Sequence, residues 1–137
     1  MPTIFATGFA ALLLLSACAA KAPTPVAPAA ALEGTLWTLR DFAGQPASGQ
    51  PLTLRFESGT ASGRAPCNSV SASYTRDGDG LRFGPIARSK MYCADASALE
   101  DAYLAALRQI DRATIQVGVL TLSGARSSLH YDSTPGK

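Results

Sequence analysis

Three cysteines and one histidine have the most reactive side chains in this 137-residue sequence. A thiol accepts a lipid, pairs with a second thiol or binds a metal, and an imidazole serves as a general base near neutral pH. The cysteines are Cys18, Cys67 and Cys93, and the histidine is His130. Because no two of these residues stand close together in the sequence, they lack the spacing typical of zinc ligands, and we predict no metal site.

Cys18 follows an apolar segment with the character of a bacterial export signal. Residues 1–17 contain no charged side chain, and residues 4–15 are almost continuously apolar. A membrane-spanning helix needs about 20 apolar residues, whereas a shorter run fits the apolar region of a signal peptide. The four residues that end at Cys18 resemble the lipobox of bacterial lipoproteins, which places a lipid on this cysteine. The alternative is a secretory signal that is cut after Ala17 or Ala20.

Residues 18–31 are expected to be the lipidated cysteine and an Ala/Pro-rich tether. The segment has three prolines and few large apolar side chains, so it cannot bury enough surface to offset its ordering entropy. Ala19 is typical of lipoproteins sorted to the outer membrane. We therefore expect a cell-envelope protein that faces the periplasm and is anchored in the outer membrane by acyl chains on Cys18.

Cys67 and Cys93 remain once Cys18 is assigned to the lipid. The expected compartment is oxidising, which favours a disulfide between them. This bond would close a loop of about 27 residues and stabilise the fold by roughly 3.5 kcal/mol in the chain-entropy model. The alternative is a pair of buried free thiols.

The rest of the chain is predicted to be one domain, at residues 32–132, with a flexible tail at 133–137. The chain holds 12 basic and 10 acidic residues, and this near balance argues against a nucleic-acid surface. The same composition offers little catalytic chemistry, since His130 is the only imidazole and is expected to be structural on a terminal strand. We therefore predict no enzyme activity and no cofactor.

Asp77 and Asp79 resemble the start of a calcium-binding loop. Such a loop needs a bidentate Glu at its twelfth position, and Arg88 stands there instead. A hairpin turn is the better interpretation of these two aspartates.

Alternation of apolar and polar residues predicts a mostly antiparallel sheet of about eight strands. The predicted strands are residues 35–39, 52–56, 60–63, 70–75, 81–83, 114–117, 119–122 and 128–131. The predicted fold class is α+β, in which the curved sheet forms a partly open barrel with one amphipathic helix packed on it.

The helix is predicted over residues 95–111, where the apolar side chains change to helical spacing. These side chains are Leu99, Tyr103, Leu107 and Ile110. Ser97 and Glu100 have the spacing of a capping box, in which each side chain satisfies a free backbone N–H at the helix start.

Four short motifs in the domain form a recognisable pattern. They are the first strand with Gly34 and Trp37, the Cys67-Asn68 pair with the later Tyr74, the Met91-Tyr92-Cys93 run, and Glu100 in the helix. Together they resemble the META domain, also called the HslJ-like domain, of bacterial envelope lipoproteins. The resemblance extends over residues 32–131. Pro66 and Ala72 stand where the family usually has Gly, so the turn before the first motif cysteine is expected to differ locally.

The resemblance implies an envelope protein associated with stress response, with no catalytic residues to carry over. We expect a non-enzymatic binding or stress-tolerance role toward an unknown envelope component. The alternative is a carrier that encloses a small apolar ligand or lipid in the partly open barrel. The possible ligand residues are Asn68, Met91, Tyr92, Trp37 and Tyr74. Each also has a structural interpretation, in a turn for the asparagine and in the core for the others.

Overall fold

The structure is a computed structural model that describes residues 31–134. The predicted signal peptide, Cys18 and nearly all of the predicted tether therefore lie outside the described residues. Within residues 31–134, no helix is both long and apolar enough to cross a membrane.

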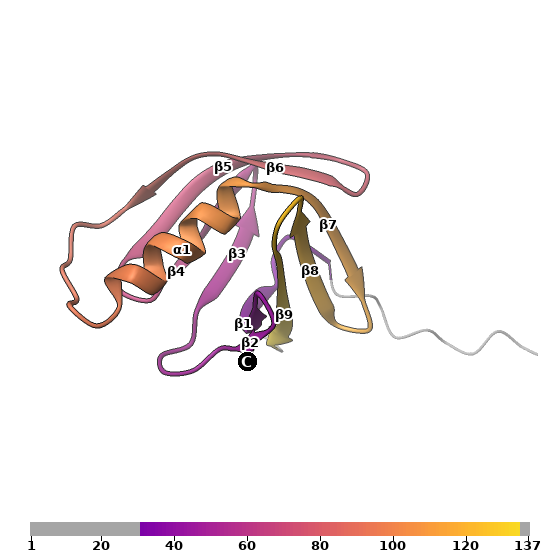
Figure 1. The fold of residues 1–137 in the computed structure, drawn as a ribbon. Coiled ribbons are helices and arrows are strands. Elements are labelled where there is room, and N and C mark those ends of the chain that lie inside the picture. The colour runs from indigo at the N-terminus through magenta and orange to yellow at the C-terminus, as the bar shows by residue number, and fades with distance from the viewer. Residues whose placement is uncertain (1–30, 135–137) are drawn as a thin grey trace, which may run out of the picture.

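The described chain is an antiparallel barrel with one helix (Figure 1). Its elements are β1 (Leu36–Phe42), β2 (Gln45–Pro46), β3 (Thr53–Glu57), β4 (Thr60–Arg64), β5 (Ser69–Asp77), β6 (Gly80–Arg88), α1 (Ser97–Arg108), β7 (Ile110–Gln116), β8 (Val119–Gly124) and β9 (Ser128–Thr134). The strand order is β2-β1-β3-β4-β5-β6-β7-β8-β9, and β1 also pairs with β9, so eight strands close the barrel and β2 lies outside it. The predicted α+β class, mostly sheet with one helix, is confirmed.

The predicted alternation places apolar side chains inside the barrel. In β5, for example, Val70, Ala72 and Tyr74 are buried while the residues between them are exposed. The largest fully buried side chains are Trp37, Tyr103, Tyr131, Phe56, Leu54, Leu81, Leu104, Leu120, Leu122, Leu129 and Glu100. An eight-stranded barrel has an interior just wide enough for side chains to fill, and these residues fill it. The eight barrel strands and α1 all contribute side chains to one hydrophobic core.

Two of the eight strand interfaces in the barrel wall, which we call seams, differ in extent. At one seam, β1 and β9 pair at six positions, from Leu36 opposite Thr134 to Phe42 opposite Leu129. At the other, β6 and β7 pair at a single position, Gly80 opposite Arg112. The helix α1 connects β6 to β7 and packs against β6. It therefore packs against one of the two strands that form the interface with the fewest paired positions.

The buried face of α1 differs from the predicted one. The buried residues are Glu100, Tyr103, Leu104, Ala106 and Leu107. Leu99 is 47% exposed, and Ile110 begins β7 instead of ending the helix. The prediction was right for Tyr103 and Leu107, which are buried, and wrong for Leu99, whose place on the buried face is taken by Glu100.

The predicted capping box is also absent from the helix start. The N-cap is Ala96, which makes no side-chain capping hydrogen bond. The Ser97 hydroxyl donates to the Cys93 carbonyl at 2.8 Å, and the Glu100 carboxylate turns away to accept hydrogen bonds from another segment. A buried acceptor role thus replaces the capping role that the spacing predicted.

Candidate functional site

One end of the barrel gathers most of the predicted site residues. Because neighbouring strands are antiparallel, β4 ends, β5 begins and β6 ends at this same end of the barrel. The helix α1 starts there too, since it follows β6 after a short connection. Cys67 and Asn68 from the β4–β5 connection therefore lie beside Met91 and Tyr92 from the β6–α1 connection. We call the latter segment, residues 89–96, the clamped loop.

Glu100 is the centre of a buried hydrogen-bond network, and it is only 1% exposed. Its Oε2 accepts from the backbone N–H of Cys67 at 2.8 Å and of Asn68 at 2.7 Å. Its Oε1 accepts from Asn68 Nδ2 at 2.6 Å and from Arg88 Nη1 at 3.3 Å. A buried carboxylate is costly unless its oxygens are satisfied, and these four donors satisfy them.

The same donors set the charge state of Glu100. Burial alone raises the pKa of a carboxyl group because it penalises the ionised form. Here the hydrogen bonds from Asn68 and Cys67, together with the charge of Arg88, outweigh burial and lower the pKa of Glu100 below its ordinary value. The residue is therefore an ionised acceptor at neutral pH.

Asn68 carries the network from Glu100 to the clamped loop. Its Oδ1 accepts from the Ser89 hydroxyl at 2.9 Å and from the Met91 backbone N–H at 2.7 Å. Its Nδ2 donates to Glu100 and also to the Met91 carbonyl at 3.3 Å. Two donors and two acceptors exhaust the usual capacity of an amide side chain. Asn68 thus has a structural role: it binds both polar groups of the Met91 backbone.

A disulfide joins the same two segments. Cys67 and Cys93 are bonded, with their Cα atoms 5.9 Å apart. The loop is also held at its start, where the Ser89 N–H donates to the Ser69 carbonyl at 3.0 Å. Hydrogen bonds at the start, the Asn68 amide in the middle and the disulfide near the end together restrict the clamped loop.

The clamped loop presents two large side chains to solvent. Met91 is 64% exposed and Tyr92 is 85% exposed. We refer to them as the exposed pair. An open hollow of about 570 Å³ lies beside them, and its lining includes Arg88, Lys90 and Asp101. The arrangement combines a restrained backbone with apolar surface that the barrel does not bury.

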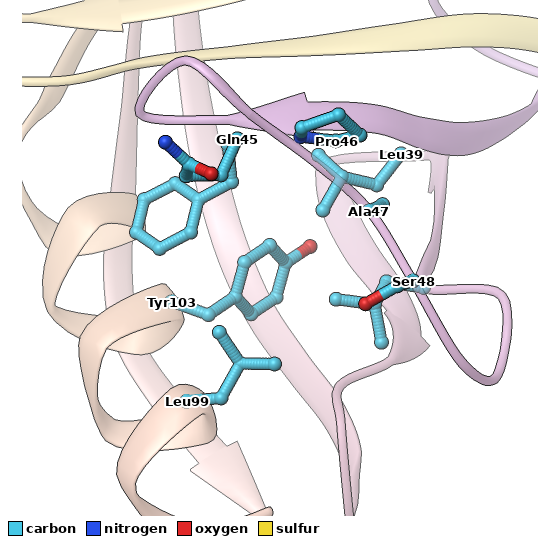
Figure 2. Close-up of a pocket in the computed structure, with 9 residues that line it drawn as sticks. Leu39, Gln45, Pro46, Ala47, Ser48, Leu99 and Tyr103 are labelled. Atoms are coloured by element: carbon cyan, nitrogen blue, oxygen red, sulfur yellow. The ribbon is translucent and has the colours of Figure 1, made fainter.

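A second, apolar pocket lies along α1 at the same end of the barrel (Figure 2). Its volume is about 260 Å³, and its main walls are Leu39, Phe42, Leu52, Leu99 and Tyr103. Leu39 and Phe42 belong to β1, and Leu99 and Tyr103 belong to α1. Residues 45–48, which follow β1 in the sequence, also line the pocket. The structure thus places two different surfaces around the first turns of the helix.

Trp37 and Tyr74 are not brought to either surface. Trp37 is fully buried, and its Nε1 donates to the Leu32 carbonyl at 3.0 Å. The Tyr74 hydroxyl donates to the Glu33 carboxylate, and burial is the main reason that the pKa of Tyr74 is raised. Both side chains belong to the core, which was the structural interpretation of the sequence.

The other polar residues of interest lie elsewhere. His130 Nδ1 is 2.7 Å from Asp41 Oδ1, in a pair that links β9 to β1. Asp77 and Asp79 flank the turn between β5 and β6, where Gly78 has a φ of 57°. Residues 31–134 contain no group of three or more acidic, His or Cys side chains placed to hold a metal ion.

The sequence motifs and the capping pattern include Glu100 but do not predict its buried role in the site. A different apolar set would have found it, because Tyr103, Leu104 and Leu107 follow it at the third, fourth and seventh positions. That spacing places Glu100 on the buried face of the helix. The capping-box pattern offered a second explanation for the same residue and concealed this signal.

The META domain family model matches residues 30–134, which confirms the resemblance drawn from the sequence motifs. An NMR structure of a protein from Burkholderia xenovorans is similar, with a TM-score of 0.64, 27% identity, and coverage of 85% of this chain and 99% of that one. A crystal structure of a DUF4847 family protein from Bacteroides vulgatus has a TM-score of 0.58 at 13% identity, covering 77% of this chain and 96% of that one. At that identity it supports the fold alone. No curated protein matches the chain.

Proposed function

The chain belongs to the META domain family, and from this premise we propose that it is a non-catalytic binding protein of the bacterial cell envelope, with the exposed pair as its docking surface. In this proposal a lipid on Cys18 anchors the chain in the outer membrane. The partner is another envelope protein, and the complex supports tolerance of envelope stress.

The observation that carries the proposal is the contrast between exposure and restraint in the clamped loop. Met91 and Tyr92 are the large hydrophobic side chains of the loop, and both have more than half of their surface exposed. Exposed apolar side chains on a mobile loop lose conformational entropy on binding, and a pre-organised loop avoids most of that cost. Tyr and Met are also enriched at protein interfaces. The loop is restrained by the Asn68 amide, the Glu100 carboxylate and the disulfide. This restraint therefore supports an interface role for the pair.

The position of the tether supports the same proposal. Leu32 lines the same hollow as Asp79, which belongs to the turn between β5 and β6. The strand β6 runs from this turn to Arg88, where the clamped loop begins. The predicted tether thus enters the domain at the end of β6 opposite the exposed pair. An anchored domain with this geometry leaves the pair accessible to a periplasmic partner.

Site-specific photo-crosslinking in living cells tests the docking surface. A photoreactive phenylalanine analogue replaces Tyr92 in the full chain, and a matched chain carries it at Val117, which is fully exposed and lies on the β7–β8 turn. We expect one discrete adduct with an envelope protein from position 92 and none from position 117. Excess purified chain should compete with this adduct, whereas excess Met91→Ser/Tyr92→Ser chain should not. Identical adducts from both positions, or no competition, would contradict the proposal.

The anchor has its own test. A Cys18→Ser chain should be released from the membrane or accumulate as an uncleaved precursor, because it cannot accept the lipid. Cell fractionation and mass measurement of the mature N-terminus distinguish these outcomes. A Cys18→Ser chain that stays membrane-bound and correctly processed would remove the lipoprotein part of the proposal.

The non-catalytic part rests on the surroundings of His130. This imidazole is paired with Asp41 on the barrel wall and does not line the hollow beside the exposed pair. We therefore expect His130→Ala to leave stress tolerance and crosslinking unchanged. Turnover of a cell-wall or peptide substrate by the purified chain, if His130→Ala abolished it, would show that the protein is an enzyme.

A further inference from the structure

The turn between β7 and β8 carries an apolar side chain that contributes nothing to the core. Val117 is fully exposed and has a φ of 49°, and Gly118 after it has a φ of 73°. A β-branched residue rarely adopts this left-handed conformation, and Asn or Asp before Gly is the usual choice in such a turn. Val117 therefore costs stability without packing inside the domain. An exposed apolar residue in a strained conformation points to a contact outside the domain.

This turn lies beside the point where the predicted tether enters the domain. Ala31, the first described residue, lines the same hollow as Gln116, which directly precedes Val117. The strand pairing agrees with this position. The Ser133 N–H donates to the Gly118 carbonyl at 2.9 Å, and Ser133 lies opposite the second residue of β1. Figure 1 shows this turn and the connection from β6 to α1 on opposite sides of the barrel.

Two other turns lie at the same end of the described barrel, because neighbouring strands are antiparallel, and both are polar. The β3–β4 turn contains Ser58 next to Glu57, and Ser58 also has a φ of 49°. The β5–β6 turn brings together Asp77 and Asp79. In contrast, residues 113–125 contain no charged side chain. The β7–β8 turn is therefore the apolar one of the three, and its backbone conformation does not explain that choice.

A lipid anchor on Cys18 would bring this end of the barrel close to a membrane. The predicted tether has 12 residues between Cys18 and Ala31, and such a segment spans about 40 Å at most. A turn confined within that distance of a bilayer meets lipid at a high effective concentration, so a weak contact is enough to orient the domain. One valine would not hold a free domain on a bilayer, but the acyl chains already supply the attachment.

We propose that the β7–β8 turn rests on the lipid leaflet that holds the Cys18 anchor, with the Val117 side chain in contact with the acyl chains. This inference rests on the anchoring part of the proposed function. The occupant is a phospholipid surface, because a single turn is far smaller than the roughly 800 Å² that a stable protein interface buries on each partner. The contact fixes the orientation of the barrel and directs the exposed pair away from the membrane.

Photo-crosslinking of the full chain in living cells tests this contact. The photoreactive phenylalanine analogue replaces Gln116, and a matched chain carries it at Ser58, which is also exposed and lies in a turn at the same end of the barrel. Intact-mass measurement identifies adducts with phospholipid. We expect a phospholipid adduct from position 116 at about tenfold higher yield than from position 58. Equal yields, no phospholipid adduct from position 116, or a protein adduct in its place would overturn the proposal.

Substitutions at Val117 separate insertion from mere proximity. With the analogue kept at position 116, Val117→Asp should lower the phospholipid adduct about tenfold, because a charged side chain does not enter the acyl region. Val117→Leu retains an apolar side chain and should keep the yield within about twofold. Ser58→Asp places the same charge in the β3–β4 turn and should leave the yield unchanged. A yield that survives Val117→Asp would contradict the role of this side chain.

The mass of the mature N-terminus distinguishes failure of this inference from failure of the proposed anchor. If Cys18 carries acyl chains and position 116 gives no phospholipid adduct, the membrane contact is wrong and the anchor stands. If Cys18 is unmodified, the anchor is wrong and the membrane contact falls with it.

Discussion

The two seams of the barrel wall are closed by different kinds of interaction. The β1–β9 seam consists of six paired positions, reinforced by side-chain pairs such as Arg40 with Asp132. The β6–β7 seam has one paired position, and α1, which connects these two strands, packs against β6. The helix is in turn fixed by the Glu100 network and lies next to the Cys67–Cys93 disulfide.

This difference determines where a single substitution should matter. A seam of backbone hydrogen bonds spreads its stabilisation over many groups, and no one side chain is indispensable. The β6–β7 seam relies instead on α1. The position of α1 depends on one buried carboxylate, that of Glu100, and on one disulfide, Cys67–Cys93. We therefore expect the protein to tolerate change at β1–β9 and to be sensitive at the start of α1.

The largest effect is expected from Glu100→Ala. This change leaves the backbone N–H groups of Cys67 and Asn68 buried without their acceptor, which should destabilise the fold by about 3–5 kcal/mol. Denaturant unfolding of the variant and of Arg40→Ala, at the other seam, measures the contrast. If Arg40→Ala is as destabilising as Glu100→Ala, the comparison between the seams is wrong.

Loss of the disulfide should have a similar but smaller effect. The bond spans a sequence separation of 26, and the chain-entropy model gives about 3.5 kcal/mol for a loop of this size. Cys67→Ala/Cys93→Ala should lower the unfolding midpoint accordingly, and a reducing agent should affect only the parent chain. Equal unfolding midpoints with and without reductant would show that the bond does not stabilise the loop.

The fold could be predicted from the sequence more fully than the site could. Eight strands followed from period-two alternation, since each buries one face in a single core. The two-residue strand β2 is too short to give such a signal. The Glu100 network joins segments more than 30 positions apart in the sequence, as the separation of 33 between Cys67 and Glu100 illustrates. Only tertiary packing reveals that the carboxylate, which also fits a helix cap, is buried instead.

Stability should depend on pH through Glu100. Its pKa is lowered in the folded state, so its contribution is present above the unfolded pKa, near 4.5, and is lost as pH falls through the folded pKa. The difference in unfolding free energy between the parent chain and Glu100→Gln should therefore shrink as pH falls below about 4.5. A difference that stays constant as the pH falls below about 4.5 would mean that the carboxylate is not ionised in the folded protein.

The smallest effect is expected at the β7–β8 turn. Val117 has a φ of 49°, and a β-branched residue rarely adopts this conformation. Val117→Asn should relieve the strain and stabilise the fold by roughly 1 kcal/mol, because Asn followed by Gly suits this type of hairpin turn. Thermal unfolding measures the gain. An unchanged or lower midpoint would show that the turn is not strained.

The central claim is that a buried network holds the clamped loop and so pre-organises the exposed pair. Amide hydrogen exchange at Met91 tests it most directly, because this N–H donates to Asn68 Oδ1 at 2.7 Å. We predict strong protection of the Met91 amide in the parent chain and its loss in Asn68→Ala, while the amides of β1 and β9 remain protected. Exchange of the Met91 amide at the rate of an unstructured peptide in the parent chain would contradict the claim.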